Sequence, residues 1–256
     1  MRLSKIKCLL LALFAFTISK CFSQSANESF YAFNKDWTAA PSLDKCTYFM
    51  QEIKKSDTEY ICRYYNKLGP MIKQESYRDE ALSMPNGFFC WYDENGKIDS
   101  CGQVLSFKKD GKWEYFLGDS TKLSYYEEYD KGKFIKRDSY HFSDTTSGEN
   151  DTTEKEATFG NNKSSWDKYI ETHLKVPDRF TRVIVKPGKY IVTVSFVVNK
   201  TGSVEQVVLL KSVEWSADAE VFRIIENSPA WQPATQKGKP VMYRQKQNLT
   251  FAVNDY

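Results

Sequence analysis

Cysteine and histidine are the residues of this chain whose side chains are best suited to redox, nucleophilic or metal chemistry. The 256-residue sequence has six cysteines and two histidines. His141 and His173 lie far from every cysteine along the chain, and no spacing matches a zinc site. No Gly-x-Ser-x-Gly motif is present, and the acidic residues are scattered along segments typical of solvated strand surfaces. We therefore expect no catalytic residue, no metal ion, no cofactor and no enzymatic activity, and a hydrolase is the least favoured hypothesis.

Disulfide formation is the chemistry that the cysteines support best. Two of the six lie in an N-terminal segment that we expect to be removed. The remaining four permit two disulfides in an oxidising compartment, with three alternative connectivities. These disulfide candidates are Cys46, Cys62, Cys90 and Cys101.

The turn between Cys90 and Cys101 decides whether these two residues can be paired. A two-residue Asn95-Gly96 turn would place them opposite each other, with Cα atoms about 5.5 Å apart and within disulfide range. A bulged three-residue loop would shift the register by one residue and put the two side chains on opposite faces of the hairpin. Both alternatives are open. The pairing of Cys46 with Cys62 follows only by elimination.

Residues 1–23 have the layout of a secretory signal peptide. Basic residues precede a run of about a dozen mostly apolar residues, and the small residues Cys21 and Ser23 predict cleavage before Gln24. Lys20 interrupts the apolar run before it reaches the roughly 20 residues that a membrane-spanning helix needs. We expect an exported protein, and an uncleaved membrane anchor is the alternative.

Loss of this segment changes the charge of the chain. It holds four basic residues and no acidic residue, so the formal net charge of +3 becomes −1. A nearly neutral chain has no electrostatic footprint for nucleic acid and no polybasic patch for a membrane surface. We expect no nucleic-acid partner, and membrane association only indirectly or through an uncleaved anchor.

Residues 24–142 form one β-rich unit in our interpretation. Short aromatic runs alternate with glycine turns, a spacing that suits the hairpins of an antiparallel meander. Two segments, 86–92 and 110–116, each begin with a glycine turn and continue as an aromatic strand. Over residues 60–140 this pattern resembles degenerate MORN-type repeats, which implies a structural or binding surface and no chemistry. A generic antiparallel sheet is the alternative.

Residues 143–163 differ sharply in composition from the segments on either side. Serine, threonine, asparagine, acidic residues and glycine dominate, and Phe159 is the one aromatic residue. Such a stretch buries too little apolar surface to offset the entropy lost on ordering. We interpret it as a polar linker between two domains with separate cores.

The C-terminal unit, residues 164–256, begins with a helical pattern. Apolar and aromatic residues recur on one helix face from Trp166 to Leu174, and Pro177 ends the pattern. Residues 189–198 and 204–210 then predict two strands joined by a turn.

A second helix and a last strand complete this unit. The helix begins at Ser216, which we expect to be its N-cap, and ends before Pro229. After a turn at Lys237-Gly238, the apolar residues Leu249 and Phe251 alternate with polar ones in a final strand. The predicted fold class is α+β: an N-terminal antiparallel β-meander of repeat hairpins, followed by a helix-strand-strand-helix-strand domain with a small antiparallel sheet.

The order of motifs in residues 164–256 resembles the TonB C-terminal domain family. The matching segments are 192–198, Gly202, 207–212 with its Lys211-Ser212 pair, 221–231, the Trp231-Gln232-Pro233 element, 238–240 and Phe251. One departure is Val176-Pro177, which stands where the family usually carries Tyr-Pro. Trp231 is more simply explained as a core anchor than as a partner contact.

The resemblance implies protein binding by strand addition. In the family, the last strand lies at a sheet edge and pairs with an extended segment of an outer-membrane transporter. The resemblance therefore implies an envelope or periplasmic location, after secretion across the inner membrane. An exposed last strand also permits a homodimer. The candidate partner-binding residues are Met242, Tyr243, Arg244, Gln245, Lys246, Gln247, Asn248, Leu249 and Thr250.

Two departures bear on energy transduction across the envelope. Transducers of this family retain an N-terminal transmembrane helix and carry a long, Pro-rich spacer. Here the apolar segment has the features of a cleaved signal, and residues 143–163 contain no proline. The favoured hypothesis is an exported binding protein without energy transduction. The alternative is a TonB-type energy transducer for outer-membrane transport with an uncleaved anchor.

Overall fold

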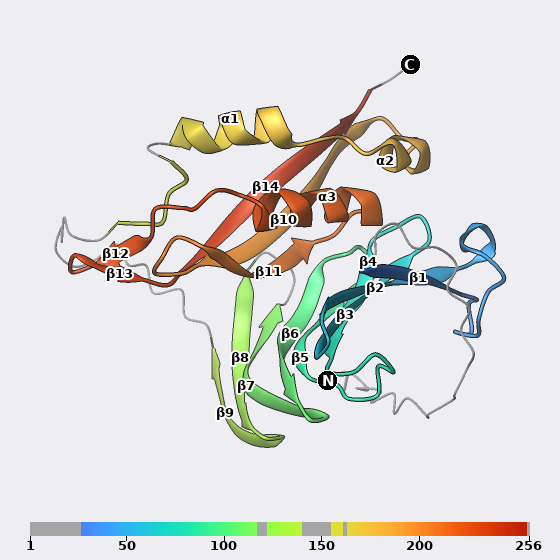
Figure 1. The fold of residues 1–256 in the computed structure, drawn as a ribbon, viewed down its shortest axis with the longest axis horizontal. Helices are drawn as coiled ribbons and strands as arrows, with labels where there is room; N and C mark the ends of the chain where they lie inside the picture. The colour runs from blue at the N-terminus through green and yellow to red at the C-terminus, as the bar shows by residue number, and fades with distance from the viewer. Residues whose placement is uncertain (1–26, 117–121, 140–154, 161–162, 255–256) are drawn as a thin grey trace.

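The computed structural model describes residues 27–116, 122–139, 155–160 and 163–254. The expected signal peptide, His141 and residues 143–154 of the expected linker lie outside them. The fold is α+β, as predicted, with a large antiparallel sheet, a small antiparallel sheet and three α-helices in the described part. Figure 1 shows the helices and the small sheet on one side and the hairpins of the large sheet on the other. No described helix has the length and apolar character needed to cross a membrane.

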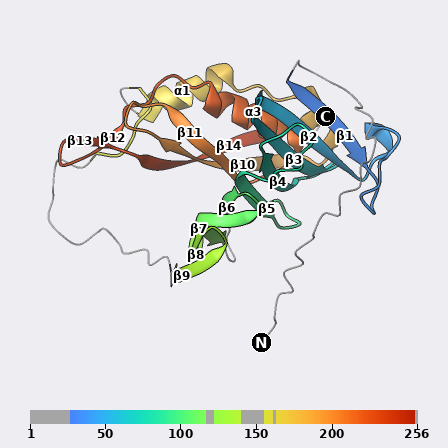
Figure 2. The same ribbon diagram turned by 60° about the horizontal axis from the view of Figure 1, so that its bottom comes forward.

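The N-terminal unit is a single nine-stranded meander in which each strand pairs with the next along the chain. Its strands are β1 (Glu28–Phe33), β2 (Tyr48–Ser56), β3 (Glu59–Asn66), β4 (Met71–Tyr77), β5 (Gly87–Tyr92), β6 (Ile98–Leu105), β7 (Lys108–Phe116), β8 (Leu123–Asp130) and β9 (Lys133–Ser139). A short 3-10 helix, η1 (Leu43–Lys45), precedes β2. Figure 2 shows β7, β8 and β9 extending away from the rest of the molecule. The predicted meander is confirmed, and its relation to MORN repeats stays a prediction.

The C-terminal unit places its helices on one face of a three-stranded sheet. The sheet has the order β11-β10-β14, with β10 (Gly188–Val198) in the centre, β11 (Val204–Lys211) on one side and β14 (Tyr243–Val253) on the other. The helices are α1 (Lys163–His173), α2 (Asp178–Val183) and α3 (Trp215–Glu226), and a small hairpin consists of β12 (Ala234–Gln236) and β13 (Lys239–Val241). The element order expected from periodicity is confirmed apart from α2 and the small hairpin, which no sequence pattern indicated as elements.

The second helix begins one residue earlier than expected, with a different cap. Glu214, not Ser216, is the N-cap of α3, and its carboxylate accepts a hydrogen bond from the Ser216 amide at 2.8 Å. The predicted N-cap is therefore wrong. A carboxylate fits this position because it satisfies an amide of the first turn and interacts favourably with the positive end of the helix dipole.

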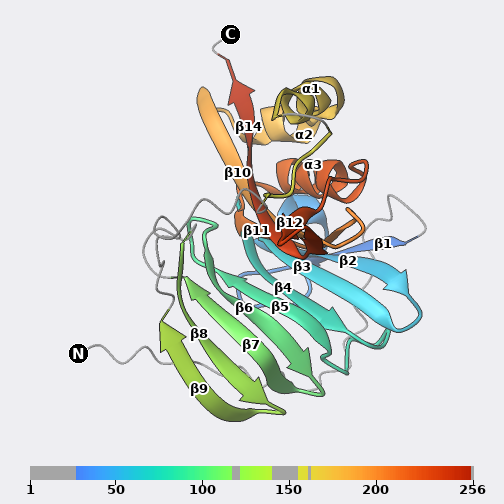
Figure 3. The same ribbon diagram turned by 90° about the vertical axis from the view of Figure 1, so that its left-hand side faces the viewer.

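One hydrophobic core extends through both units, so the expectation of separate cores is wrong. Phe49, Tyr65 and Met71 from the large sheet belong to the same buried cluster as Val221 and Ile225 of α3. Figure 3 shows β1 to β4 beneath α3. The boundaries of the proposed domains remain a prediction. The shared core means that neither unit has a complete apolar interior without the other.

Part of the expected linker is packed, which corrects the interpretation of residues 155–160. The backbone at Lys155 pairs with Thr235, and Ala157 is only 2% exposed. The Phe159 ring lies 5.2 Å from Trp166 and 5.3 Å from Trp231. Phe159 packing between two indoles, together with this backbone pairing, holds the polar segment against the domain.

Candidate partner-binding edge

The last strand, β14, has one face turned toward the core and one toward solvent. Leu249 and Phe251 are buried beneath the helices, whereas Arg244, Lys246 and Asn248 are exposed. Of the predicted partner-binding residues, 243–250 lie in this strand, and Met242 lies just before it with 53% of its surface exposed. The alternation places the polar members of the candidate set on one face, where another molecule can reach them.

β14 is an edge strand of the small sheet. Its pairing with β10 is antiparallel and uninterrupted from Tyr243 opposite Val198 to Val253 opposite Gly188. No strand in the described part of the chain pairs with its other side. The outer side of β14 therefore presents unpaired backbone donors and acceptors over the length of the strand.

The register identifies which backbone groups of β14 point outward. At the start of the β10–β11 turn, the Asn199 amide donates a hydrogen bond to the Ser203 carbonyl at 2.9 Å, so the backbone of Asn199 faces β11. Backbone groups in a strand alternate sides, and β10 is in unbroken register with β14, so Val198, Phe196 and every second residue before them face β14.

The β14 residues opposite Val198, Phe196 and the alternate residues before them must direct their backbone amide and carbonyl groups toward β10. These inward residues are Tyr243, Gln245, Gln247, Leu249 and Phe251. The residues between them have amide and carbonyl groups that face away from the sheet. These outward residues are Arg244, Lys246, Asn248, Thr250 and Ala252. A partner strand would hydrogen-bond to this second set, so the candidate residues divide into two groups with different roles.

The opposite edge of the small sheet is bridged to the N-terminal unit at one end. The backbone of Lys211, at the end of β11, is bridged to Lys97, and the Ser212 amide donates to the Gly96 carbonyl at 2.8 Å. Val208 and Leu210 of β11 pack in a cluster with Phe116 of the large sheet. The two edges therefore differ, because β14 has no such bridge on its outer side among the described residues.

The exposed face of β14 is basic. Arg244 lies 3.9 Å from the carboxylate of Glu114 on β7 and contacts the hydroxyl of Ser195 at 3.5 Å, while Lys246 is in no ion pair among the described residues. The Asn248 side chain accepts a hydrogen bond from the Thr193 hydroxyl at 2.9 Å. The contact between Arg244 and Glu114 joins the edge strand to the large sheet, and no sequence pattern indicated it.

Trp231 is a core residue, as expected. Its side chain is 4% exposed, and its ring lies 5.1 Å from that of Phe196 on β10. The backbone of Trp231 also contacts the β10–β11 turn: the Trp231 amide donates a hydrogen bond to the Gly202 carbonyl at 2.8 Å. A Cβ atom on Gly202 would lie 2.1 Å from the Trp231 carbonyl oxygen, so glycine is required at this turn.

The structure pairs Cys90 with Cys101 through a compensation that the sequence did not reveal. The loop between β5 and β6 has three residues, since Asp93 pairs with Lys97, and this alone would shift the register. One extra residue in β6, Asp99, restores the register that puts Cys90 opposite Cys101. Both are free, buried thiols, and the neighbouring Cys90 thiol and burial together raise the pKa of Cys101.

The pairing of Cys46 with Cys62 is contradicted by the register. Cys62 lies opposite Glu52, whereas Cys46 precedes Thr47 at the other end of β2. The five steps along the chain from Thr47 to Glu52 span about 16 Å of extended strand, far beyond disulfide range. The two thiols are buried in different clusters, and burial raises the pKa of Cys62.

The remaining residues with chemical potential are dispersed. The exposed His173 ring contacts the Tyr169 carbonyl at 2.9 Å and stacks on the Tyr169 ring. No group of three or more histidine, cysteine or acidic side chains with metal-binding geometry is found in the described ranges.

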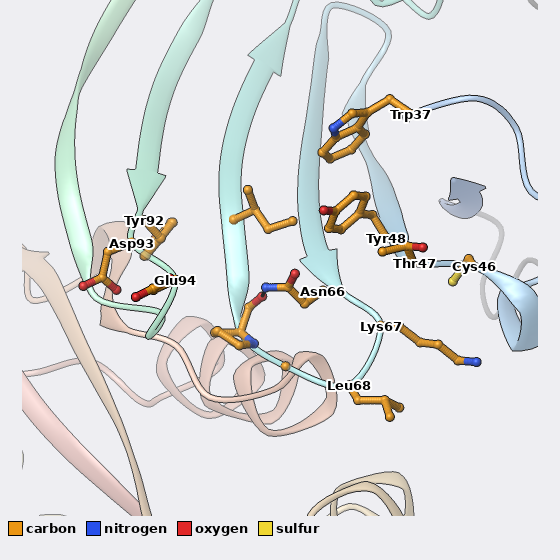
Figure 4. Close-up of a pocket in the computed structure, with 13 residues that line it drawn as sticks. Trp37, Cys46, Thr47, Tyr48, Asn66, Lys67, Leu68, Tyr92, Asp93 and Glu94 are labelled. Atoms are coloured by element: carbon orange, nitrogen blue, oxygen red, sulfur yellow. Dashed lines mark hydrogen bonds between the residues drawn. The ribbon is translucent and has the colours of Figure 1, made fainter. Parts of the chain in front are cut away.

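An open groove of about 790 Å³ lies at the ends of β2 to β5, and no sequence pattern indicated it. Figure 4 shows Trp37 and Tyr48 on one side of the groove and Asp93 and Glu94 on the other. The two aromatic rings stack at 4.5 Å. Trp37 is 42% exposed and has a φ of 65°, a conformation that bulky residues rarely adopt.

The C-terminal unit thus has a small sheet with helices on a single face; β11 is bridged to the N-terminal unit at its end, and β14 is unpaired on its outer side among the described residues. In a comparison with family models, residues 191–253 match the family described as Gram-negative bacterial TonB protein C-terminal. The predicted TonB resemblance is confirmed for this segment, which includes β10, β11, α3 and β14. Comparisons with curated proteins and with solved structures gave no match.

Proposed function

We propose that this chain is an exported envelope protein, not an enzyme, whose TonB-like domain binds an extended segment of another protein by adding it as a strand beside β14. The family match supports a protein-binding role in the cell envelope. The observation that carries the proposal is that β14 pairs on one side only among the described residues, whereas β11 is also bridged to the N-terminal unit at its end. The outward backbone groups from Arg244 to Ala252 would supply the hydrogen bonds.

The side chains along this edge favour an acidic segment. Arg244 and Lys246 flank the position of an added strand on the exposed face, and opposite charges on neighbouring strands attract. Charged edge residues also prevent sheets from aggregating edge to edge, and the same two residues would serve that purpose in the absence of a partner. We favour an acidic segment of an outer-membrane transporter as the partner.

Photo-crosslinking on the full chain tests the proposal. The full chain is needed because the two units share one core. A crosslinking amino acid in place of Lys246 should capture an envelope protein. The same amino acid in place of Lys200, in the β10–β11 turn, should not capture it. The captured segment is then synthesised as a peptide, and its affinity is measured for the unmodified protein and for variants of Lys246.

Two substitutions at Lys246 separate the backbone from the side chain. Lys246→Ala keeps the outward amide and should weaken binding modestly, by about threefold, because only a solvated charge is lost. Lys246→Pro also removes the amide and should weaken binding by a further tenfold or so, about 1.4 kcal/mol. Proline is tolerated there because the Lys246 amide does not pair with β10. Equal binding by the alanine and proline variants would refute strand addition at this edge.

We further propose that binding occurs without energy transduction. A force-transmitting protein needs an anchored N-terminus and an extended spacer. Here part of the expected linker is fixed to the domain, since the Lys155 amide donates to the Thr235 carbonyl at 3.0 Å. Sequencing the N-terminus of the protein isolated from cells tests the point. A start at or near Gln24 supports export with cleavage, and an intact Met1 would instead favour an anchored transducer.

A further inference from the structure

A small cavity lies where the large sheet meets α2 and the start of α3, away from the β14 edge. Its volume is about 270 Å³. Phe30 of β1, Phe49 of β2 and Trp215 of α3 form its apolar walls, and Lys67, Arg179 and Arg182 bring positive charge to it. A concave, mostly apolar space with a few convergent polar groups is the usual form of a small-molecule site.

The aromatic walls are held in place by one another. The Phe30 and Trp215 rings meet edge to face with centroids 5.2 Å apart, and Phe49 meets Trp215 in the same way at 6.1 Å. Phe30 and Phe49 are each 3% exposed. The apolar part of the cavity is therefore preformed and can take the body of an apolar ligand without rearrangement.

The three basic side chains differ in how far they are already neutralised. Arg179 donates to the carboxylate of buried Glu214 at 2.7 Å and to the Lys67 carbonyl at 2.7 Å, so its charge is balanced and its position fixed. The Lys67 ammonium donates to a backbone carbonyl, that of Asp44. Arg182, one helical turn beyond Arg179, is exposed and is in no ion pair within the described ranges. Lys67 and Arg182 therefore give the cavity an excess of positive charge.

A buried hydrogen-bond donor in the cavity wall lacks an acceptor. The indole nitrogen of Trp215 is inaccessible to solvent and has no hydrogen-bond partner among the described residues. Buried donors are nearly always paired, because the desolvated group is otherwise costly. Because solvent does not reach this nitrogen, a ligand oxygen could accept from the indole N–H only if the Trp215 ring shifted.

We propose that this cavity binds a small apolar carboxylate. The aromatic walls would enclose the apolar body, while the carboxylate would face Lys67 and Arg182. The volume suits a single aromatic or branched aliphatic group. A carboxylate beside an apolar group is found both in a free aromatic acid and in the C-terminal residue of a peptide. The probes below distinguish these two kinds of ligand.

Proton–nitrogen NMR spectra of the full chain test the proposal with 3-phenylpropionate as the probe. The indole signal of Trp215 is assigned by its loss in Trp215→Phe. Titration with 3-phenylpropionate should move this signal, and the neutral 3-phenylpropanamide should not. Arg182→Ala should weaken binding about tenfold, corresponding to about 1.4 kcal/mol. Lys200→Ala removes an exposed charge outside the cavity and should leave the affinity unchanged.

Acetyl-Ala-Phe, with either a free or an amidated C-terminus, identifies the source. Tighter binding of the free peptide acid than of 3-phenylpropionate points to a peptide C-terminus, and binding of 3-phenylpropionate alone points to a free acid. An unmoved Trp215 signal at millimolar 3-phenylpropionate, equal binding of the acid and its amide, or full affinity in Arg182→Ala would each overturn the proposal. None of these results bears on strand addition at β14, which uses different residues.

Discussion

Replacing Asp218 by asparagine should remove much of the pH dependence of stability above pH 5. Asp218 is fully buried where α3 meets the large sheet, and burial raises its pKa from 3.8 to about 7. Its carboxylate accepts hydrogen bonds from the Ser212 hydroxyl and the Val213 amide, which lower the pKa but do not offset burial. The nearby carboxylate of Glu214 raises the pKa further, and Arg63 lowers it.

The sign of the effect follows from the raised pKa. The folded state binds the Asp218 proton more tightly than the unfolded state, so the stabilisation is complete below about pH 4 and is lost as the pH rises through 7. Three pKa units correspond to about 4 kcal/mol at most. Between pH 5 and pH 8 the free energy of unfolding should therefore fall by about 2–3 kcal/mol because of this group.

Urea unfolding followed by tryptophan fluorescence measures the effect at several pH values. Near pH 5 the free energy of unfolding of Asp218→Asn should lie within about 1 kcal/mol of that of the unmodified protein, because the asparagine amide oxygen still accepts a hydrogen bond from the Val213 amide. Near pH 8 it should be more stable by about 2 kcal/mol. The matched control is Asp167→Asn at an exposed position on α1, which should follow the unmodified protein. If the free energy of unfolding changed with pH in the same way for Asp218→Asn and the unmodified protein, the reasoning would be refuted.

Two other predictions concern the turn of the small sheet and the cysteine pair. Gly202→Ala should lower the free energy of unfolding by about 2 kcal/mol or more, because the residue has a φ of 87° and a Cβ would collide with the Trp231 carbonyl. The control, Lys200→Ala in the same turn, should change the free energy of unfolding by less than about 0.5 kcal/mol. Equal denaturation midpoints for the two variants would contradict this account. Refolding with oxidised glutathione should join Cys90 to Cys101 by thiol–disulfide exchange, with release of reduced glutathione. Peptide mass mapping checks this outcome, and a bond between any other two described cysteines would show that the register is wrong.

The elements of the C-terminal unit were predictable because their signals are local. Alternation at Leu249 and Phe251 marks one buried face of a strand, and the apolar positions from Val221 to Ile225 mark one face of a helix. The position of the candidate edge followed from the order of these elements and the family resemblance. The direction of each backbone group did not, because it depends on the register between β10 and β14.

Features that depend on distant residues were missed. The packing of Phe159 requires indoles that are contributed by α1 and by the segment after α3, and composition alone cannot show that they converge. The pairing of Cys46 with Cys62 was inferred only by elimination among the four remaining cysteines, whereas the β2–β3 register separates these two residues. The pairing of Cys90 with Cys101 depended on two irregularities that cancel, a three-residue loop and an extra residue in β6.

The arrangement of the two units bears on how specifically the β14 edge can choose a partner. A free three-stranded sheet has two edges, and backbone hydrogen bonding alone discriminates poorly between extended segments. Here the Gly96 turn occupies the end of β11, and Glu114 of the large sheet reaches Arg244 on β14. A strand added beside Arg244 would lie close to the acidic side chain that already holds it. If β14 binds a partner as proposed, an acidic partner residue would compete with Glu114 for Arg244, and the N-terminal sheet would then take part in selecting the partner.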